Sequence, residues 1–188
     1  SPRYGTNKFP EFDYSEIRPS GLPIKGFGGT SSGPEPLIQM HERIESYLDA
    51  FCSGRLECKS KTWKEINGEW KEVEIDVDKP YSHTRLIADI FNAIGACVVA
   101  GNVRRSAEIC LGDADDEDFI NLKNYNINPE RSSIGWLSNN SVVLKADKEY
   151  EDFSYIPDMA RRICDNGEPG MINLSNIQKY GNCKGGYS

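Results

Sequence analysis

Two consecutive stretches with different periodicities decide the fold: Leu86-Ile-Ala-Asp-Ile-Phe-Asn-Ala-Ile94 and Val103-Arg-Arg-Ser-Ala-Glu-Ile-Cys-Leu111. In the first stretch, apolar residues recur every three or four positions, which predicts an amphipathic helix over about 83–95 that ends at Gly95. In the second, small or apolar residues alternate with polar ones, which predicts a strand with two different faces. A helix that leads into a strand is typical of an α/β protein.

The same alternation continues on both sides of these stretches. Pro34 and Pro36 suit the first turn of a helix, and apolar residues recur on one face as far as Phe51. Beyond residue 111, a polar loop over 124–133 precedes a short strand, and a further helix is predicted over about 155–165. Helices that alternate with short strands favour an α/β layered or barrel arrangement.

Residues 52–81 break this pattern. Apolar and charged residues interleave on both sides of Asn67-Gly68, which is the strongest short signal for a β-hairpin. We therefore predict an exposed β-hairpin, inserted into a chain that otherwise forms part of one domain over residues 1–188.

Composition excludes several classes of function. The net charge is -7 and the Lys and Arg residues are dispersed, so a general nucleic-acid surface is not expected. No apolar run approaches the length of a membrane span, and no secretory leader is visible, so we expect a soluble, cytoplasmic protein without a membrane partner. The six scattered cysteines form no C-x-x-C pair and there are only two histidines, so no metal site is predicted and reduced thiols are expected.

The glycine-rich run Gly26-Phe-Gly-Gly-Thr-Ser-Ser-Gly33 is the first candidate binding site. Its glycines let the backbone approach a ligand closely, and the helix that follows offers free N–H groups to a phosphate. Arg18 and Lys25 flank the run and could hold a triphosphate through charge-assisted hydrogen bonds. The spacing alone equally allows a plain flexible loop, since neither a Walker A sequence nor a dinucleotide fingerprint is present.

Two further stretches are weaker candidates. Adjacent Arg104 and Arg105 point to opposite faces of a strand, and the simplest interpretation is a structural ion pair of one of them with Glu108 or with the acidic run that follows. In the loop over 124–133, asparagines and Arg131 could hydrogen-bond the edge of a base, although alone this is only a polar loop.

Taken together, these stretches resemble the large, catalytic subunit of ribonucleotide reductases, in particular the monomeric adenosylcobalamin-dependent (class II) type. The matching stretches come in the family's order and are Phe12–Leu37, Gly95–Ile109, Asp118–Tyr125, Ser138–Val142 and Asn166–Gly170. The resemblance implies part of a ten-stranded α/β barrel, from an enzyme that reduces ribonucleoside triphosphates to deoxyribonucleotides by thiyl-radical chemistry.

The resemblance also implies roles for individual residues. Arg18, Lys25, Gly26, Gly28 and Gly29 fall in the family's first specificity loop, where a deoxynucleoside triphosphate effector binds. The second specificity loop passes the identity of the effector to the substrate base.

Asn124, Asn126 and Arg131 fall in that second loop, with Arg131 at the base-contacting position. The implied cofactor is adenosylcobalamin, bound mainly by parts of the parent outside this chain, and the implied reductant is of the thioredoxin type.

Departures from the family pattern limit what can be carried over. The radical cysteine of the family lies in an Asn-x-Cys-x-Glu run, and Asn182-Cys183-Lys184-Gly185 lacks the Glu. No catalytic residue is therefore assigned, and the chain is interpreted as an internal fragment that is inactive alone. A non-catalytic deoxynucleotide-binding regulatory module derived from the same barrel is the alternative.

Overall fold

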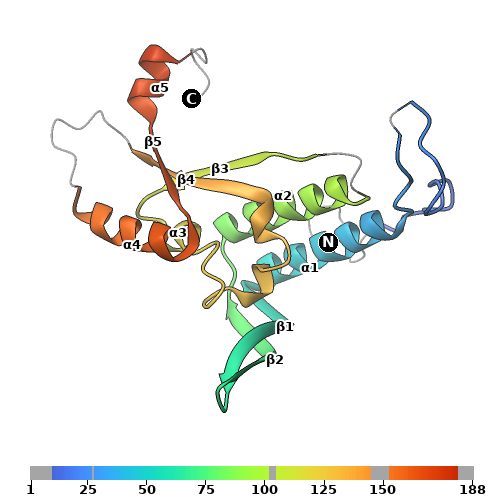
Figure 1. The fold of residues 1–188 in the computed structure, drawn as a ribbon, viewed down its shortest axis with the longest axis horizontal. Coiled ribbons are helices and arrows are strands. Elements are labelled where there is room, and N and C mark those ends of the chain that lie inside the picture. Colours follow the sequence, from blue (N-terminus) through green and yellow to red (C-terminus); the bar gives the residue numbers. More distant parts are fainter. Residues whose placement is uncertain (1–9, 27, 102–104, 145–152, 182–188) are drawn as a thin grey trace.

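The computed structural model describes residues 10–26, 28–101, 105–144 and 153–181 (Figure 1). Two long helices lie side by side: α1 (Glu35–Ser53) and α2 (His83–Val99). The first begins next to Pro34 and Pro36, as predicted, and ends at Gly54, whose left-handed φ of 75° lets its N–H reach the carbonyls of the last turn. The second begins where the Ser82 side chain accepts a hydrogen bond from the backbone N–H of Arg85.

The predicted stop at Gly95 is wrong, because α2 continues through it to Val99. The glycine has another role here: a Cβ at this position would collide with the carboxylate of Glu108, at the start of β3 (Glu108–Asp113). The glycine thus permits a close approach of helix and strand instead of ending the helix.

The predicted hairpin is present between the two helices. Strands β1 (Arg55–Ile66) and β2 (Glu69–Pro80) pair antiparallel, with Arg55 opposite Pro80 and Ile66 opposite Glu69. Asn67 and Gly68 form the turn, and both have positive φ values of 55° and 81°, as a two-residue turn between twisted strands requires. In Figure 1 the hairpin extends away from the helices, and its free end is exposed.

The second half of the chain builds a parallel sheet in the order β3-β4-β5, with β4 (Ser138–Leu144) in the middle and β5 (Gly170–Asn173) at one side. The remaining elements are α3 (Glu117–Ile120), η1 (Pro129–Arg131), η2 (Gly135–Leu137), η3 (Phe153–Tyr155), α4 (Ile156–Asn166) and α5 (Leu174–Tyr180). The described strands thus form one parallel sheet and one antiparallel hairpin, and the predicted α/β class stays a prediction. The ten-stranded barrel stays a prediction.

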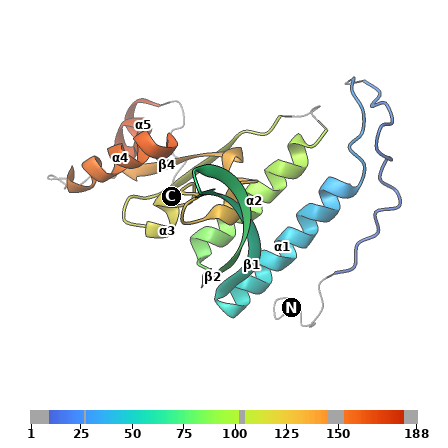
Figure 2. The same ribbon diagram turned by 60° about the horizontal axis from the view of Figure 1, so that its bottom comes forward.

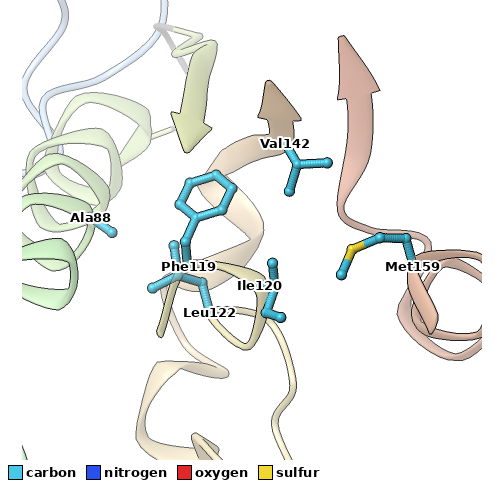
Figure 3. Packing of buried hydrophobic residues seen from close by; sticks show 6 residues of the cluster. All are labelled: Ala88, Phe119, Ile120, Leu122, Val142 and Met159. Carbon is cyan, nitrogen blue, oxygen red and sulfur yellow. The ribbon is translucent and has the colours of Figure 1, made fainter. Parts of the chain in front are cut away.

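Two apolar clusters hold the fold together. The first joins α2, α3, β4 and α4 through Ala88, Phe119, Ile120, Leu122, Val142 and Met159 (Figure 3). The second joins the base of the hairpin to both long helices and contains Ala50, Leu56, Val77, Tyr81 and Leu86. Because the second cluster lies under the hairpin, the hairpin is fixed to the helices at its base. Among the described helices, none is long and apolar enough to cross a membrane.

Candidate functional site: two loops on a helix pair

The glycine-rich segment forms an exposed ribbon directly before α1. Pro23 and Thr30 form an isolated antiparallel bridge, and the backbone N–H of Ile24 donates to the carbonyl of Gly29 at 3.0 Å. Gly26, Gly28 and Gly29 have φ values of 91°, 71° and 79°, which favour glycine strongly at these positions. In Figure 2 the ribbon, drawn in blue, stands away from the rest of the chain.

The two predicted cations of this ribbon are exposed. Arg18 makes a long contact of 3.4 Å from Nη1 to the carbonyl of Pro23, across the ribbon. Lys25 lies in the turn between the bridged residues and makes no hydrogen bond or ion pair with any other described residue. Both side chains are therefore accessible to an anion in the solvent.

The second predicted loop folds into consecutive turns. The side chain of Asn124 accepts a hydrogen bond from the backbone N–H of Asn126 at 3.2 Å, and the backbone N–H of Asn128 donates to the carbonyl of Asn124 at 2.7 Å. Asn126 is exposed and Asn124 is half-buried. The amide of Asn126 is thus available to a ligand, whereas the oxygen of Asn124 supports its own turn.

Arg131, the residue predicted to contact a base, lies inside the protein with 1% of its surface exposed. Its Nε donates to Asp89 Oδ1 at 2.6 Å, Nη1 to the carbonyl of Leu122 at 2.5 Å and Nη2 to Asn92 Oδ1 at 2.7 Å. In this arrangement the guanidinium ties the loop to α2. Its contact with a base stays a prediction, and it would require these hydrogen bonds to be given up.

Sequence reasoning missed the polar cluster that receives Arg131. Arg85, Asp89 and Asn92 occupy positions i, i+4 and i+7 of α2, so they share one face of the helix, and each is at most 3% exposed. Asp89 also accepts a hydrogen bond from Tyr81 Oη at 2.9 Å and from Arg85 Nη2 at 3.3 Å. A polar stripe at helical spacing, opposite the apolar one, was the signal in the sequence.

The hairpin contacts the second loop through Lys79. Its Nζ donates to the carbonyl of Ile127 at 3.1 Å, to Asn128 Oδ1 at 2.6 Å and to Glu130 Oε1 at 2.7 Å. Arg85 reaches the same two side chains, at 2.8 and 2.7 Å. Two cations, Lys79 of the hairpin and Arg85 of α2, therefore hold the loop in place.

Burial shifts the pKa values of groups around this cluster. Burial lowers the pKa of Lys79 below its usual value, although the nearby Glu130 carboxylate opposes the shift. Burial, together with the negative charge of Asp89, raises the pKa of the Tyr47 phenol to about 12 and that of Tyr81 further still. Both phenols are therefore protonated at neutral pH.

A small pocket lies between α1, α2 and the end of the second loop. Its volume is about 160 Å3, and it is lined by the first turns of α1, including Pro36, by the second half of α2, and by Ser133 and Ile134 at the end of the second loop. Close by, Gly101 packs so tightly on the end of the glycine-rich ribbon that a Cβ would lie 3.2 Å from Ser32 Cβ. Both loops thus end against the same part of α1 and α2.

The ion pair expected for the weaker strand candidate stays a prediction, because one of its two arginines is not among the described residues. The carboxylate of Glu108 accepts a hydrogen bond from Asn92 Nδ2 at 2.8 Å, and Arg105 is exposed. Arg104 lies outside the described residues, as does Cys183. Among the described residues, no group of His, Cys, Asp and Glu side chains could hold a metal ion.

Comparisons with known proteins give the segment its context. A family model described as "B12-dependent ribonucleotide reductase, insertion domain" matches residues 7–48. The chain is 42% identical over 175 residues to an adenosylcobalamin-dependent ribonucleoside-triphosphate reductase of Euglena gracilis, in an alignment that covers 93% of this chain and 20% of that protein. The chain matches a segment of the B12-dependent ribonucleotide reductases.

Other relatives of the ribonucleotide reductase family agree with this. The reductase of the same description from Lactobacillus leichmannii is 41% identical over 175 residues, covering 93% of this chain and 19% of the relative. A "probable" one from Dictyostelium discoideum is 42% identical over 171 residues, covering 91% and 18%. The chain thus spans about a fifth of the length of these ribonucleotide reductases. No solved structure matches it.

The ribonucleotide reductase family model includes the glycine-rich ribbon, with Arg18 and Lys25, together with most of α1. The second loop lies outside the matched range but inside the aligned part of the relatives, since the alignments cover at least 90% of this chain. The pocket of about 160 Å3 therefore lies where the insertion-domain match meets the rest of the reductase segment.

Proposed function

We propose that this chain is a piece of an adenosylcobalamin-dependent ribonucleoside-triphosphate reductase and that it carries the allosteric specificity loops of that enzyme. The parent would reduce ribonucleoside triphosphates, with electrons from a thioredoxin-type reductant, in the cytoplasm. This chain would contribute the site for a deoxynucleoside triphosphate effector, and it would perform no radical step itself.

One observation carries the regulatory part of the proposal: both predicted loops end against the same part of the α1–α2 pair. Ser32, at the end of the ribbon, packs on Gly101 just beyond α2, and Ser133 and Ile134, at the end of the second loop, line a pocket with α1 and α2. An effector on the ribbon and a substrate near the second loop could then favour the same position of the helix pair, which is what coupling between two sites needs.

The exposed cations of the ribbon suit the triphosphate of the effector. Arg18 and Lys25 project from a backbone with several positive-φ glycines, so phosphate oxygens can approach both the side chains and the main chain. The pockets around α1, of about 470 and 550 Å3, suit ligands of drug size, and adenosylcobalamin is much larger. We therefore assign no described residue to the cofactor.

Calorimetric titration of the full-length protein with dATP, dTTP and dGTP tests this proposal. Arg18→Ala should weaken effector binding by about 1.5–3 kcal/mol, the value of a lost charge-assisted hydrogen bond. Arg161→Ala is the matched control, since Arg161 is an exposed arginine of α4, far along the chain from the ribbon. Equal effector affinity of the Arg18 and Arg161 variants would remove the ribbon from the site.

A further inference from the structure

Helix α2 carries apolar residues on every side. From Ile90 to its end at Val99 it contains no charged residue, and its two charged residues, Arg85 and Asp89, are buried in the polar cluster that receives the second loop. A helix on the surface of a globular protein normally turns a polar side to the solvent, whereas a helix that is apolar all round is buried. The composition of α2 therefore indicates a helix that is covered on all sides.

Two sides of α2 are covered within this chain. One side packs on α1, with Cys97 in the wall of the pocket of about 160 Å3 between the two helices. Another side lies against the second loop, where Asp89 accepts a hydrogen bond from Arg131, and against the start of β3, which Gly95 approaches closely. These two sides bury the small and polar residues of the helix.

The third side of α2 is apolar and exposed. Its residues follow one another at intervals of four, three and four positions, and they are Ile87, Phe91, Ile94 and Val98. Each of them is at least 39% exposed, and Phe91 is 60% exposed. Residues at these intervals form one stripe along a helix, and the alternation of three and four is the spacing with which helices pack on one another. The stripe therefore suits another helix as its partner.

We propose that a helix from another part of the same reductase polypeptide packs on this stripe. The inference rests on the proposed function, in which the chain is a piece of a longer enzyme. This chain spans about a fifth of the length of its relatives, so most of such a parent would lie outside it. A segment of the same polypeptide is present at a high effective concentration, which favours it over a second copy. The partner would place apolar side chains opposite Phe91, since burying an unpaired charge there is costly.

Hydroxyl-radical footprinting of the full-length protein, followed by mass spectrometry, tests this interface. Phe119 is the matched control, because it is the same type of residue and is 3% exposed in the core of this chain. Each oxidation rate is divided by the rate in the urea-unfolded protein, which removes the intrinsic reactivity of the side chain. Phe91 should be protected as strongly as Phe119. If Phe91 of the folded protein is oxidised nearly as fast as in the unfolded protein, the proposal is overturned.

Dilution distinguishes the proposed helix from a second copy of the protein. Footprinting is repeated at a concentration at which sedimentation shows only monomers, and Phe91 should stay protected. Protection that disappears in the monomer would assign the stripe to a second copy and overturn the proposal.

A charge on the stripe provides a second test. The variant Val98→Cys should react slowly with N-ethylmaleimide in the folded full-length protein. Adding Phe91→Asp should raise that rate about tenfold or more, because the buried charge displaces the partner helix. Trp63→Asp is the control, since Trp63 is exposed on the hairpin, and it should leave the rate unchanged. A rate that Phe91→Asp does not change in a folded protein contradicts the interface.

The effector titration keeps this interface separate from the proposed function, because Arg18 and Lys25 lie on the ribbon and not on α2. Normal effector binding with an unprotected Phe91 would overturn the interface alone. A protected Phe91 in a protein that binds no effector would support the interface and count against the regulatory role alone.

Discussion

Replacing Arg131 by Met tests whether the second loop is held by a buried ion pair. The guanidinium is 1% exposed and donates to Asp89, to the carbonyl of Leu122 and to Asn92. Met fills much of the same space but donates nothing. The substitution therefore leaves the Leu122 carbonyl and the Asn92 oxygen buried without this donor, and it removes one of the two cations beside Asp89.

The expected fall in the free energy of unfolding follows from these lost contacts. Removing one partner of a buried ion pair costs about 3–5 kcal/mol, because the other charge stays buried. Asp89 keeps its contacts with Arg85 at 3.3 Å and with Tyr81 at 2.9 Å, which reduces the loss of stability. The oxygens of Leu122 and Asn92, which lose their donor, increase it. We expect the free energy of unfolding to fall by about 3–5 kcal/mol in urea denaturation followed by far-UV circular dichroism. For a chain of this length, the melting temperature should fall by roughly 6–20 °C.

Arg161→Met is the control, because Arg161 is exposed and its contact with Asp158 is a surface ion pair at 3.4 Å. Its loss should be about 1 kcal/mol or less. If Arg131→Met costs no more than this control, the guanidinium is not buried against Asp89 in solution. That result, together with an altered substrate preference of the parent, would support the base-contacting role instead.

Three more predictions concern the same region. Lys79→Met removes three contacts to the second loop, so amide hydrogen exchange over 124–133 should become faster while α4 stays unchanged, and equal protection in both proteins would contradict this role. The folded-state pKa of Tyr47, about 12, lies above its unfolded value of about 10, so the unfolded state loses its proton first as pH rises. The free energy of unfolding should therefore fall with pH across that window, by up to about 1.4 kcal/mol per unit, and Tyr47→Phe should lack this component in urea denaturation. Burial raises the pKa of the Cys58 thiol, so iodoacetamide should modify it more slowly than the exposed Cys52, as followed by mass spectrometry, and the reverse order would contradict the burial.

Short sequence motifs predicted the elements of the fold well where the motif is typical of a single local structure. Asn67-Gly68 gave the hairpin because positive φ at both positions closes a two-residue turn. Gly95 was misread because a glycine also serves where two elements approach closely, and the partner here, Glu108, is known only once the strand has been placed against the helix. The local sequence shows the glycine, but it does not show that Glu108 lies next to it in the folded chain.

In the candidate site, too, local patterns predicted exposed groups but not contacts between residues far apart in the chain. The cations of the ribbon, Arg18 and Lys25, are both exposed, as the composition of the segment predicted. The burial of Arg131 depends on Asp89 and Asn92, which precede it by 42 and 39 positions, and no local pattern joins them. The one signal in the sequence was the polar stripe Arg85, Asp89 and Asn92 on α2, which indicated that a polar or charged side chain packs against this face of the helix.

The hairpin contacts the second loop at its base. Lys79 gives three donor contacts to residues 127–130 and lies at the base of β2, where Val77 and Tyr81 fix the strand in the apolar cluster under the hairpin. We therefore expect a substitution at the tip of the hairpin to leave the loop unchanged, and a substitution at its base to disturb the loop.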